Sequence, residues 1–403
     1  MGGRPSSVRL TGPLTPFGES FRRELEGQGY KPHAVTDQLR LAAHLSRWLS
    51  EHKIDLANVD DAVIDRFLAA RRDQGYVLWL SRKAMVPLVG HLREVGVVAE
   101  PLDVPPTTPA ALALNAYRDY LVRERGLAGG TVDSYMHTAG LLLRWWAGDG
   151  PLRLDHLNAD DVIEFVRTEC DGRRFGSAKD IACGTRALLR YLFLTGAIAT
   201  ELATVVPKVA GWRMATLPSF LTAEEIGRLL ASCDRRSALG RRDYAVLILL
   251  ARMGLRAGEV AGLELSHIDW RAGEVLVRGK GRREERLPLP AEAGEALAGW
   301  LWRGRPRCDC PQVITRVRAP HRPLSSSGIS AIVAAACRRA GLPVIHAHRL
   351  RHSAATQMLQ AGADLTEVGQ VLRHRSVLTT AIYAKVDRQA LAGLALPWPG
   401  RAS

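Results

Sequence analysis

Several features are missing from this 403-residue chain, and each absence excludes a class of protein. No apolar run reaches the roughly 20 residues of a membrane span, so we expect no membrane association. The opening MGGRPSSVRLTGP lacks the apolar stretch of a secretory signal. Of six scattered cysteines only Cys308 and Cys310 lie close together, and no second Cys or His pair completes a zinc spacing. We therefore expect a cytoplasmic protein with reduced thiols and no metal site.

Signatures of nucleotide binding and of two-metal catalysis are missing as well. The glycine-containing segment RGKGRR (278–283) lacks the Ser or Thr and the following helix of a phosphate-binding loop. The sequence also has no acidic cluster of the kind that holds two Mg²⁺ ions. It therefore predicts a protein without a cofactor.

Basic residues, by contrast, are abundant. The net charge is +14 and the sequence pI is about 10.0. This surplus favours a polyanionic partner, because neutralising phosphates releases counterions; a basic but inert surface is the alternative. With 47% hydrophobic and 24% charged residues the composition is that of a globular protein, and the length suits two or three domains.

Two proline-bearing stretches, 100–109 and 207–218, resemble domain boundaries, because proline stops helices. They predict helical domains over 1–100 and 107–206 and a third domain over 217–403. The first two domains look like copies of each other at an offset of about 96–98 residues. The matching segments are FRRELEGQGY with YRDYLVRERG, LAAHLSRWL with AGLLLRWWA, and VDDAVIDRFL with NADDVIEFV. Apolar residues recur at helical spacing in both copies, which predicts four or five short helices in each.

The last third combines helices with a small sheet. Thr222 and Glu225 form a capping box that predicts the start of a helix. The segment 244–253 is apolar nearly all round, which predicts a buried helix. Between 268 and 289 the period changes to that of three antiparallel strands, and we expect helices to resume by about Ser326. The predicted fold class is mainly α with a small antiparallel β-sheet.

The most informative residues are six polar side chains in this last third. They lie in the segments GLRAGEV, RGKGRREERLPL, HRLRHSAAT and LRHRSVLTTAIY. In chain order they are Arg256, Lys280, His348, Arg351, His374 and Tyr383. Two arginines, two histidines and a lysine, followed by a tyrosine, make a site that can bind one phosphate and offer it a nucleophile.

In identity, order and spacing these residues resemble the catalytic domain of tyrosine recombinases, the phage-integrase and Xer-type family. The resemblance covers about 217–385, and residues 107–206 resemble the core-binding domain of the same family. The first copy is an extra domain that shorter members lack. Arg373 stands where the family usually has a glycine, directly before His374.

The resemblance implies a role for each residue of the set. Arg256 and Arg351 would bind the scissile phosphate. His348 and His374 would donate hydrogen bonds to the phosphate or handle its protons. Tyr383 would be the nucleophile; its pKa is ordinarily about 10, and neighbouring cations favour the phenolate.

Chemistry supports two further assignments. Glu259 lies three positions after Arg256 and therefore shares its face, where it would fix the arginine rotamer. Lys280 stands out in a chain that otherwise uses arginine heavily. A lysine can give up a proton more readily than an arginine, so Lys280 is the candidate general acid for the departing 5′ oxygen.

These roles imply a site-specific recombinase or integrase that cuts and rejoins DNA through a 3′-phosphotyrosyl intermediate and exchanges strands between two duplexes. The implied partners are double-stranded DNA with inverted-repeat target sites and further copies of the chain, as a tetramer on DNA. Two alternatives stay open at this point. A type IB topoisomerase uses a similar residue set, and a DNA-binding regulator could carry an inactive site.

Overall fold

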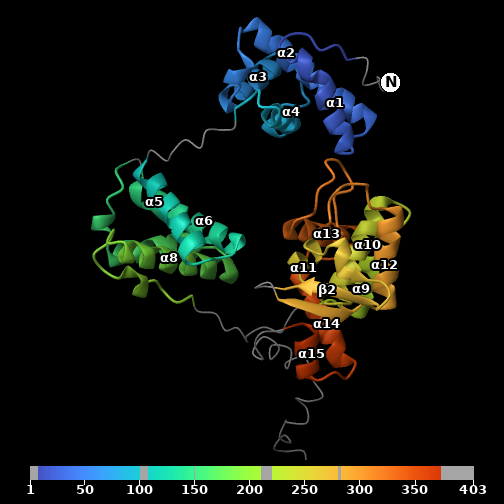
Figure 1. Ribbon diagram of the computed structural model, residues 1–403. Helices are drawn as coiled ribbons and strands as arrows, with labels where there is room; N and C mark the ends of the chain where they lie inside the picture. Colours follow the sequence, from blue (N-terminus) through green and yellow to red (C-terminus); the bar gives the residue numbers. More distant parts are fainter. Residues whose placement is uncertain (1–7, 100–107, 149, 210–219, 280–282, 374–403) are drawn as a thin grey trace, which may run out of the picture. The chain divides into compact units, whose positions relative to one another are not determined.

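The computed structural model describes residues 8–99, 108–148, 150–209, 220–279 and 283–373. Within these ranges the chain is mainly helical and has one small antiparallel sheet (Figure 1), which confirms the predicted fold class. No helix of the described ranges combines the length and apolar character that a membrane crossing requires.

Buried apolar side chains gather in three large cores. They lie within residues 14–98, 117–206 and 221–350. By residue contacts the chain divides into two compact units, residues 101–215 and the remainder. The division into three domains stays a prediction.

Each of the first two cores is built from four α-helices in the same order. The first set comprises α1 (Gly18–Gly27), α2 (Pro32–Glu51), α3 (Asp61–Asp73) and α4 (Arg82–Glu94). The second set comprises α5 (Pro109–Asp119), which continues into a π-helical turn at Tyr120–Glu124, α6 (Gly129–Ala147), α7 (Ala159–Cys170) and α8 (Phe175–Leu194). The expected number of helices in each copy is therefore confirmed, but α2, α6 and α8 have 19 or 20 residues and are longer than expected.

The repeat extends to the way its third helix begins. The side chain of Asp60 accepts a hydrogen bond of 2.8 Å from Val63 N at the start of α3. Asn158 accepts one of 3.3 Å from Asp161 N at the start of α7. Such caps satisfy backbone N–H groups that have no partner inside the helix, so both copies use the same device at the same place.

The last third contains the sheet and the remaining helices. Its helices are α9 (Ala223–Ala231), α10 (Ala238–Ala251), α11 (Ala257–Ala261), α12 (Ala291–Arg303), α13 (Ser326–Arg339), α14 (Ala347–Gln360) and α15 (Leu365–Val371). Its strands are β1 (Ile268–Asp269), β2 (Glu274–Arg278) and β3 (Glu284–Pro288), antiparallel in the order β1-β2-β3. The capping box of Thr222 and Glu225 is present at the start of α9. The sheet and the capping box are both as predicted.

Helix α10 is the centre of this part, because it contacts α9, α11, α12, α13 and α14. Its residues from Ala245 to Ala251 are all buried, as the apolar pattern predicted. The helix begins at Ala238, earlier than expected, because the Ser237 hydroxyl caps it by accepting a hydrogen bond of 3.0 Å from Gly240 N. The buried helix leads directly to the segment that carries Arg256.

A helix begins at Ser326 as expected (α13), but the prediction missed α12, which already follows the sheet. Buried Ala293, Ala296, Leu297 and Trp300 recur along α12 at helical spacing. The indole N–H of Trp300 donates a hydrogen bond of 2.8 Å to Val313 O. The sequence of α12 therefore has the helical period of apolar residues, directly after the strand pattern.

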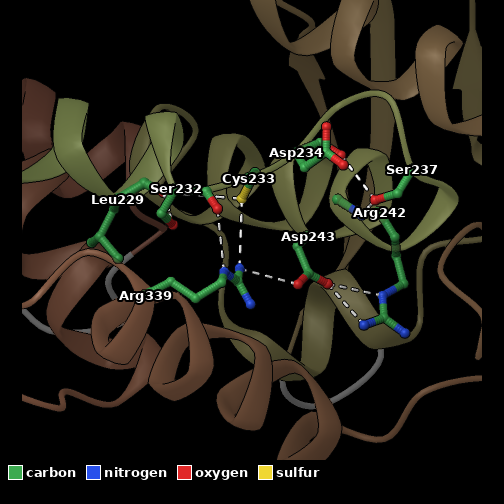
Figure 2. A network of polar contacts seen from close by, with 9 residues as sticks. Leu229, Ser232, Cys233, Asp234, Ser237, Arg242, Asp243 and Arg339 are labelled. Atoms are coloured by element: carbon green, nitrogen blue, oxygen red, sulfur yellow. Dashed lines mark hydrogen bonds and ion pairs between the residues drawn. The ribbon is translucent and has the colours of Figure 1, made fainter.

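A buried carboxylate joins α10 to its neighbours (Figure 2). The side chain of Asp243 is 4% exposed and pairs with Arg242 at 2.8 Å and with Arg339 of α13 at 3.2 Å. Arg339 also donates a hydrogen bond of 3.2 Å to Ser232 O, just after α9. Charges in a protein interior need such partners, so this network fixes α9, α10 and α13 relative to one another.

Candidate active site

Arg256 and Glu259 form the first part of the site. Gly254 follows α10 with φ +62°, a left-handed conformation that glycine adopts without strain. Arg256 then occupies the cap position of α11, where its backbone N–H donates a hydrogen bond of 2.8 Å to Glu259 Oε2. Its guanidinium Nη1 lies 2.6 Å from Glu259 Oε1. The pairing predicted from the spacing is therefore present.

Arg351 forms the second part and lies on α14, with 1% of the residue exposed. Its Nη1 donates a hydrogen bond of 2.5 Å to Gly254 O, and its Nη2 donates one to Leu372 O. The Nη2 of Arg256 donates a weaker one, 3.4 Å, to Arg373 O. The two arginines thus hold the last two carbonyl groups before His374.

His348 lies on α14 one turn before Arg351. Its ring centroid is 4.4 Å from that of His352 in an edge-to-face arrangement. Although the residue is exposed, the groups around the ring desolvate it. This desolvation lowers the pKa of His348, and the charges of Arg351 and Arg256 lower it further. A neutral imidazole at neutral pH can donate from one nitrogen and accept at the other.

Three of the predicted site residues, Lys280, His374 and Tyr383, lie outside the described residues. The described residues on either side of the segment 280–282 show where β2 ends and where β3 begins. Gly279 N donates a hydrogen bond of 2.8 Å to Arg283 O. A Cβ placed on Gly279 would lie 3.9 Å from Glu259 Oε1. The end of β2 that leads to Lys280 therefore lies beside the pair of Arg256 and Glu259.

Arg373 is a residue of the site to which the sequence alone assigned no role. Its side chain is 6% exposed, and its Nη2 lies 2.6 Å from Glu259 Oε2. The departure from glycine next to His374 was visible in the sequence. The partner was not, because Glu259 is 114 positions away.

Models of two families match the chain. The phage integrase family matches residues 219–390, and the phage integrase N-terminal SAM-like domain matches residues 114–194. A putative integrase/recombinase, y4rA of Sinorhizobium fredii, is 39% identical over 97% of this chain and 96% of its own length. Tyrosine recombinase XerD of Mycobacterium tuberculosis is 34% identical over 70% of this chain and 95% of its own length.

Solved structures share the fold. XerH recombinase bound to a palindromic difH substrate aligns with a TM-score of 0.57 at 20% identity, over 74% of this chain and 99% of that one. A lambda integrase dimer bound to a core site aligns with a TM-score of 0.54 at 18% identity, over 72% and 96%.

The fold, the paired arginines and these similarities define an enzyme that breaks and rejoins DNA with a tyrosine nucleophile. The chain belongs to the phage integrase family of tyrosine recombinases and acts in site-specific recombination. Neither a type IB topoisomerase nor an inactive DNA-binding regulator is favoured by these matches.

Proposed function

We propose that the six residues Arg256, Lys280, His348, Arg351, His374 and Tyr383 carry out the strand exchange. The phenolate oxygen of Tyr383 attacks the scissile phosphorus, and the bond from phosphorus to the 5′ oxygen breaks. Lys280 gives that oxygen its proton, which leaves a 3′-phosphotyrosyl bond and a free 5′-hydroxyl. The 5′-hydroxyl of a partner strand then attacks the phosphotyrosyl bond, so one phosphoester replaces another.

One observation carries this proposal. The residues Arg256, Arg351 and the carbonyl groups of Leu372 and Arg373 are joined by hydrogen bonds although they come from three separate segments. These hydrogen bonds therefore hold the guanidinium groups of Arg256 and Arg351 against the backbone segment that directly precedes His374 in the sequence. Positioned cations stabilise the charge that develops on the phosphate oxygens in the transition state, and guanidinium groups suit phosphate geometry.

The charge distribution supports double-stranded DNA as the partner. Residues 216–403 contain 28 Lys and Arg against 16 Asp and Glu, whereas residues 101–215 contain 13 of each. The basic surplus therefore belongs mainly to the part that carries the site. We expect the salt dependence of DNA binding to come chiefly from this part, because it reports the number of neutralised phosphates.

Assembly on an inverted-repeat DNA site is the finer proposal about partners. The structural neighbours include a lambda integrase tetramer bound to a Holliday junction, with a TM-score of 0.52 at 19% identity. Recombination joins two duplexes, and each strand that is cut needs one nucleophile. We therefore propose that four protomers assemble, two on each duplex, and that each duplex offers them an inverted repeat.

The test of the proposed function is the replacement Tyr383→Phe, assayed with a nicked suicide DNA substrate on denaturing gels. The variant should bind DNA and form no covalent adduct, because phenylalanine lacks the nucleophilic oxygen. Tyr244→Phe is the matched control, because Tyr244 packs against the core beneath Arg235 and away from the proposed chemistry. Adduct formation by Tyr383→Phe at the wild-type yield would overturn the assignment.

A further inference from the structure

The backbone at Arg373 is in a conformation that arginine rarely adopts. Its φ is +55°, in the left-handed region that glycine enters without strain. A side chain in this conformation costs free energy, and such strain persists only where the surroundings enforce it. The interactions of the Arg373 side chain must therefore compensate for this cost.

The side chain of Arg373 is held between two carboxylates. Its Nη2 lies 2.6 Å from Glu259 Oε2, and its Nε lies 3.8 Å from Glu285 Oε2 on β3. The nearer carboxylate is buried, with 4% of its side chain exposed, whereas Glu285 is 44% exposed. Because solvent screens exposed pairs more strongly than buried ones, Glu259 is the dominant partner.

Glu259 therefore serves two guanidinium groups at once. Its Oε1 lies 2.6 Å from Arg256 Nη1, and its Oε2 lies 2.6 Å from Arg373 Nη2. With a glycine at 373, this carboxylate would face Arg256 alone and would neutralise much of its charge. With Arg373 present, one negative charge is shared between two positive ones, and the cluster keeps a net positive charge beside the phosphate-binding position.

We propose that Arg373 is a positioning residue for strand cleavage, which acts through Glu259 by offsetting the carboxylate that would otherwise reduce the charge of Arg256. This inference rests on the proposed function, in which Arg256 stabilises the phosphate. The side chain of Arg373 is buried, and its contact with the site is the ion pair with Glu259. Its effect should therefore appear in the rate of cleavage, with little change in the affinity for DNA.

The burial of Arg373 agrees with this role. Its Nε and Nη1 atoms have no hydrogen-bond partner among the described residues. Burial lowers the pKa of Arg373, although an arginine stays protonated at neutral pH. The negative charge that stabilises the buried Arg373 guanidinium therefore comes mainly from Glu259. The coupling between these two residues can be measured.

The experiment is a double-mutant cycle between positions 373 and 259, read from single-turnover cleavage of a suicide DNA substrate. In the wild-type background Arg373→Met should slow cleavage by on the order of 10- to 100-fold, with the Kd for the same DNA nearly unchanged. Arg373→Lys, which keeps the charge, should recover part of that loss. In a Glu259→Gln background there is no carboxylate charge to offset, so Arg373→Met should then cost little.

Glu285→Gln is the matched control, because it removes the long and exposed ion pair and leaves Glu259 in place. It should leave the cleavage rate near that of the wild type. The proposal is overturned if Arg373→Met cleaves at the wild-type rate, or if it costs the same factor in both backgrounds. Should Arg373→Met fail to fold, the same comparison is made with Arg373→Lys, whose smaller loss must also shrink in the Glu259→Gln background.

These outcomes are separate from a failure of the proposed function. An adduct in the Tyr383→Phe variant would show that another group is the nucleophile. The coupling between 373 and 259 is read from the cleavage rate itself, whichever group attacks the phosphate.

Discussion

Arg351 donates a hydrogen bond of 2.5 Å to the carbonyl oxygen of Gly254, which precedes it by 97 positions. The same arginine donates to Leu372 O. One buried side chain thus joins the turn before Arg256 to the segment before His374. Arg351 therefore positions both the turn that carries Arg256 and the segment that leads to the proposed nucleophile.

Gly254→Ala should destabilise this junction. A Cβ at this position would lie 2.5 Å from Leu372 Cδ2, and the φ of +62° is unfavourable for alanine. We expect a loss of about 2–4 kcal/mol in the free energy of unfolding, since strain and overpacking both contribute. Gly273→Ala is the control, because Gly273 has φ +65° and, apart from its chain neighbours, no described residue has a heavy atom within 4 Å of a Cβ placed there. Equal losses in urea unfolding would contradict the steric explanation.

Asp243→Ala should be among the most destabilising single changes in this part of the chain. It removes a buried carboxylate and leaves Arg242 and Arg339 without the ion pair that each makes with it. Breaking such a buried pair typically costs about 3–5 kcal/mol. Glu292→Ala, which removes the exposed ion pair with Arg252, should cost less than about 1 kcal/mol. The denaturation midpoints of the two variants provide the test. Similar losses of stability in both would show that the network in Figure 2 contributes little to the stability of the fold.

The lowered pKa of His348 makes a prediction about stability and pH. Its folded-state pKa lies below the ordinary value of 6.5, so the unfolded chain binds a proton first as the pH falls. The contribution of His348 to the free energy of unfolding should therefore decrease below about pH 6.5 and level off below the folded-state pKa. His348→Gln should reduce this decrease, measured by urea unfolding between pH 5 and pH 8. An unchanged pH dependence would show that a group other than His348 is responsible.

Lys280→Ala should cleave ordinary DNA slowly and regain its rate on a substrate with a 5′-bridging sulfur, because a thiolate leaves without a proton. Lys280→Arg should behave in the same way, since arginine keeps the charge and does not readily give up a proton. Cleavage rates on the two substrates, measured side by side, provide the test. A loss that is equally large with the sulfur substrate would remove Lys280 from the role of general acid.

Local signals in the sequence predicted much of the fold. The capping box of Thr222 and Glu225 and the antiparallel pairing of β2 with β3 each depend on residues a few positions apart in the sequence, and the structure contains both. The pair of Arg256 and Glu259 is equally local. By contrast, no helix was predicted between the sheet and Ser326, although the buried residues of α12 recur at helical spacing.

The interactions at Arg373 and Arg351 could not be predicted in this way. Arg373 pairs with Glu259, and Arg351 donates to the carbonyl group of Gly254. These partners are 114 and 97 positions apart in the sequence, and contacts over such separations produce no periodic pattern. The φ of Arg373 is likewise a consequence of packing, since a sequence-based reading assigns that conformation to glycine. The roles of Lys280, His374 and Tyr383 stay predictions.

The hydrogen bonds from Arg351 and Arg256 to the carbonyl groups of Leu372 and Arg373 also limit the distance that the proposed nucleophile, Tyr383, can reach. Tyr383 follows Arg373 by ten residues. A fully extended chain covers at most about 3.3–3.6 Å per residue, so the Cα of Tyr383 lies within about 36 Å of this anchor in every conformation. A phosphate must therefore be presented within the reach of this ten-residue segment and the tyrosine side chain, measured from the carbonyl groups that the two arginines hold.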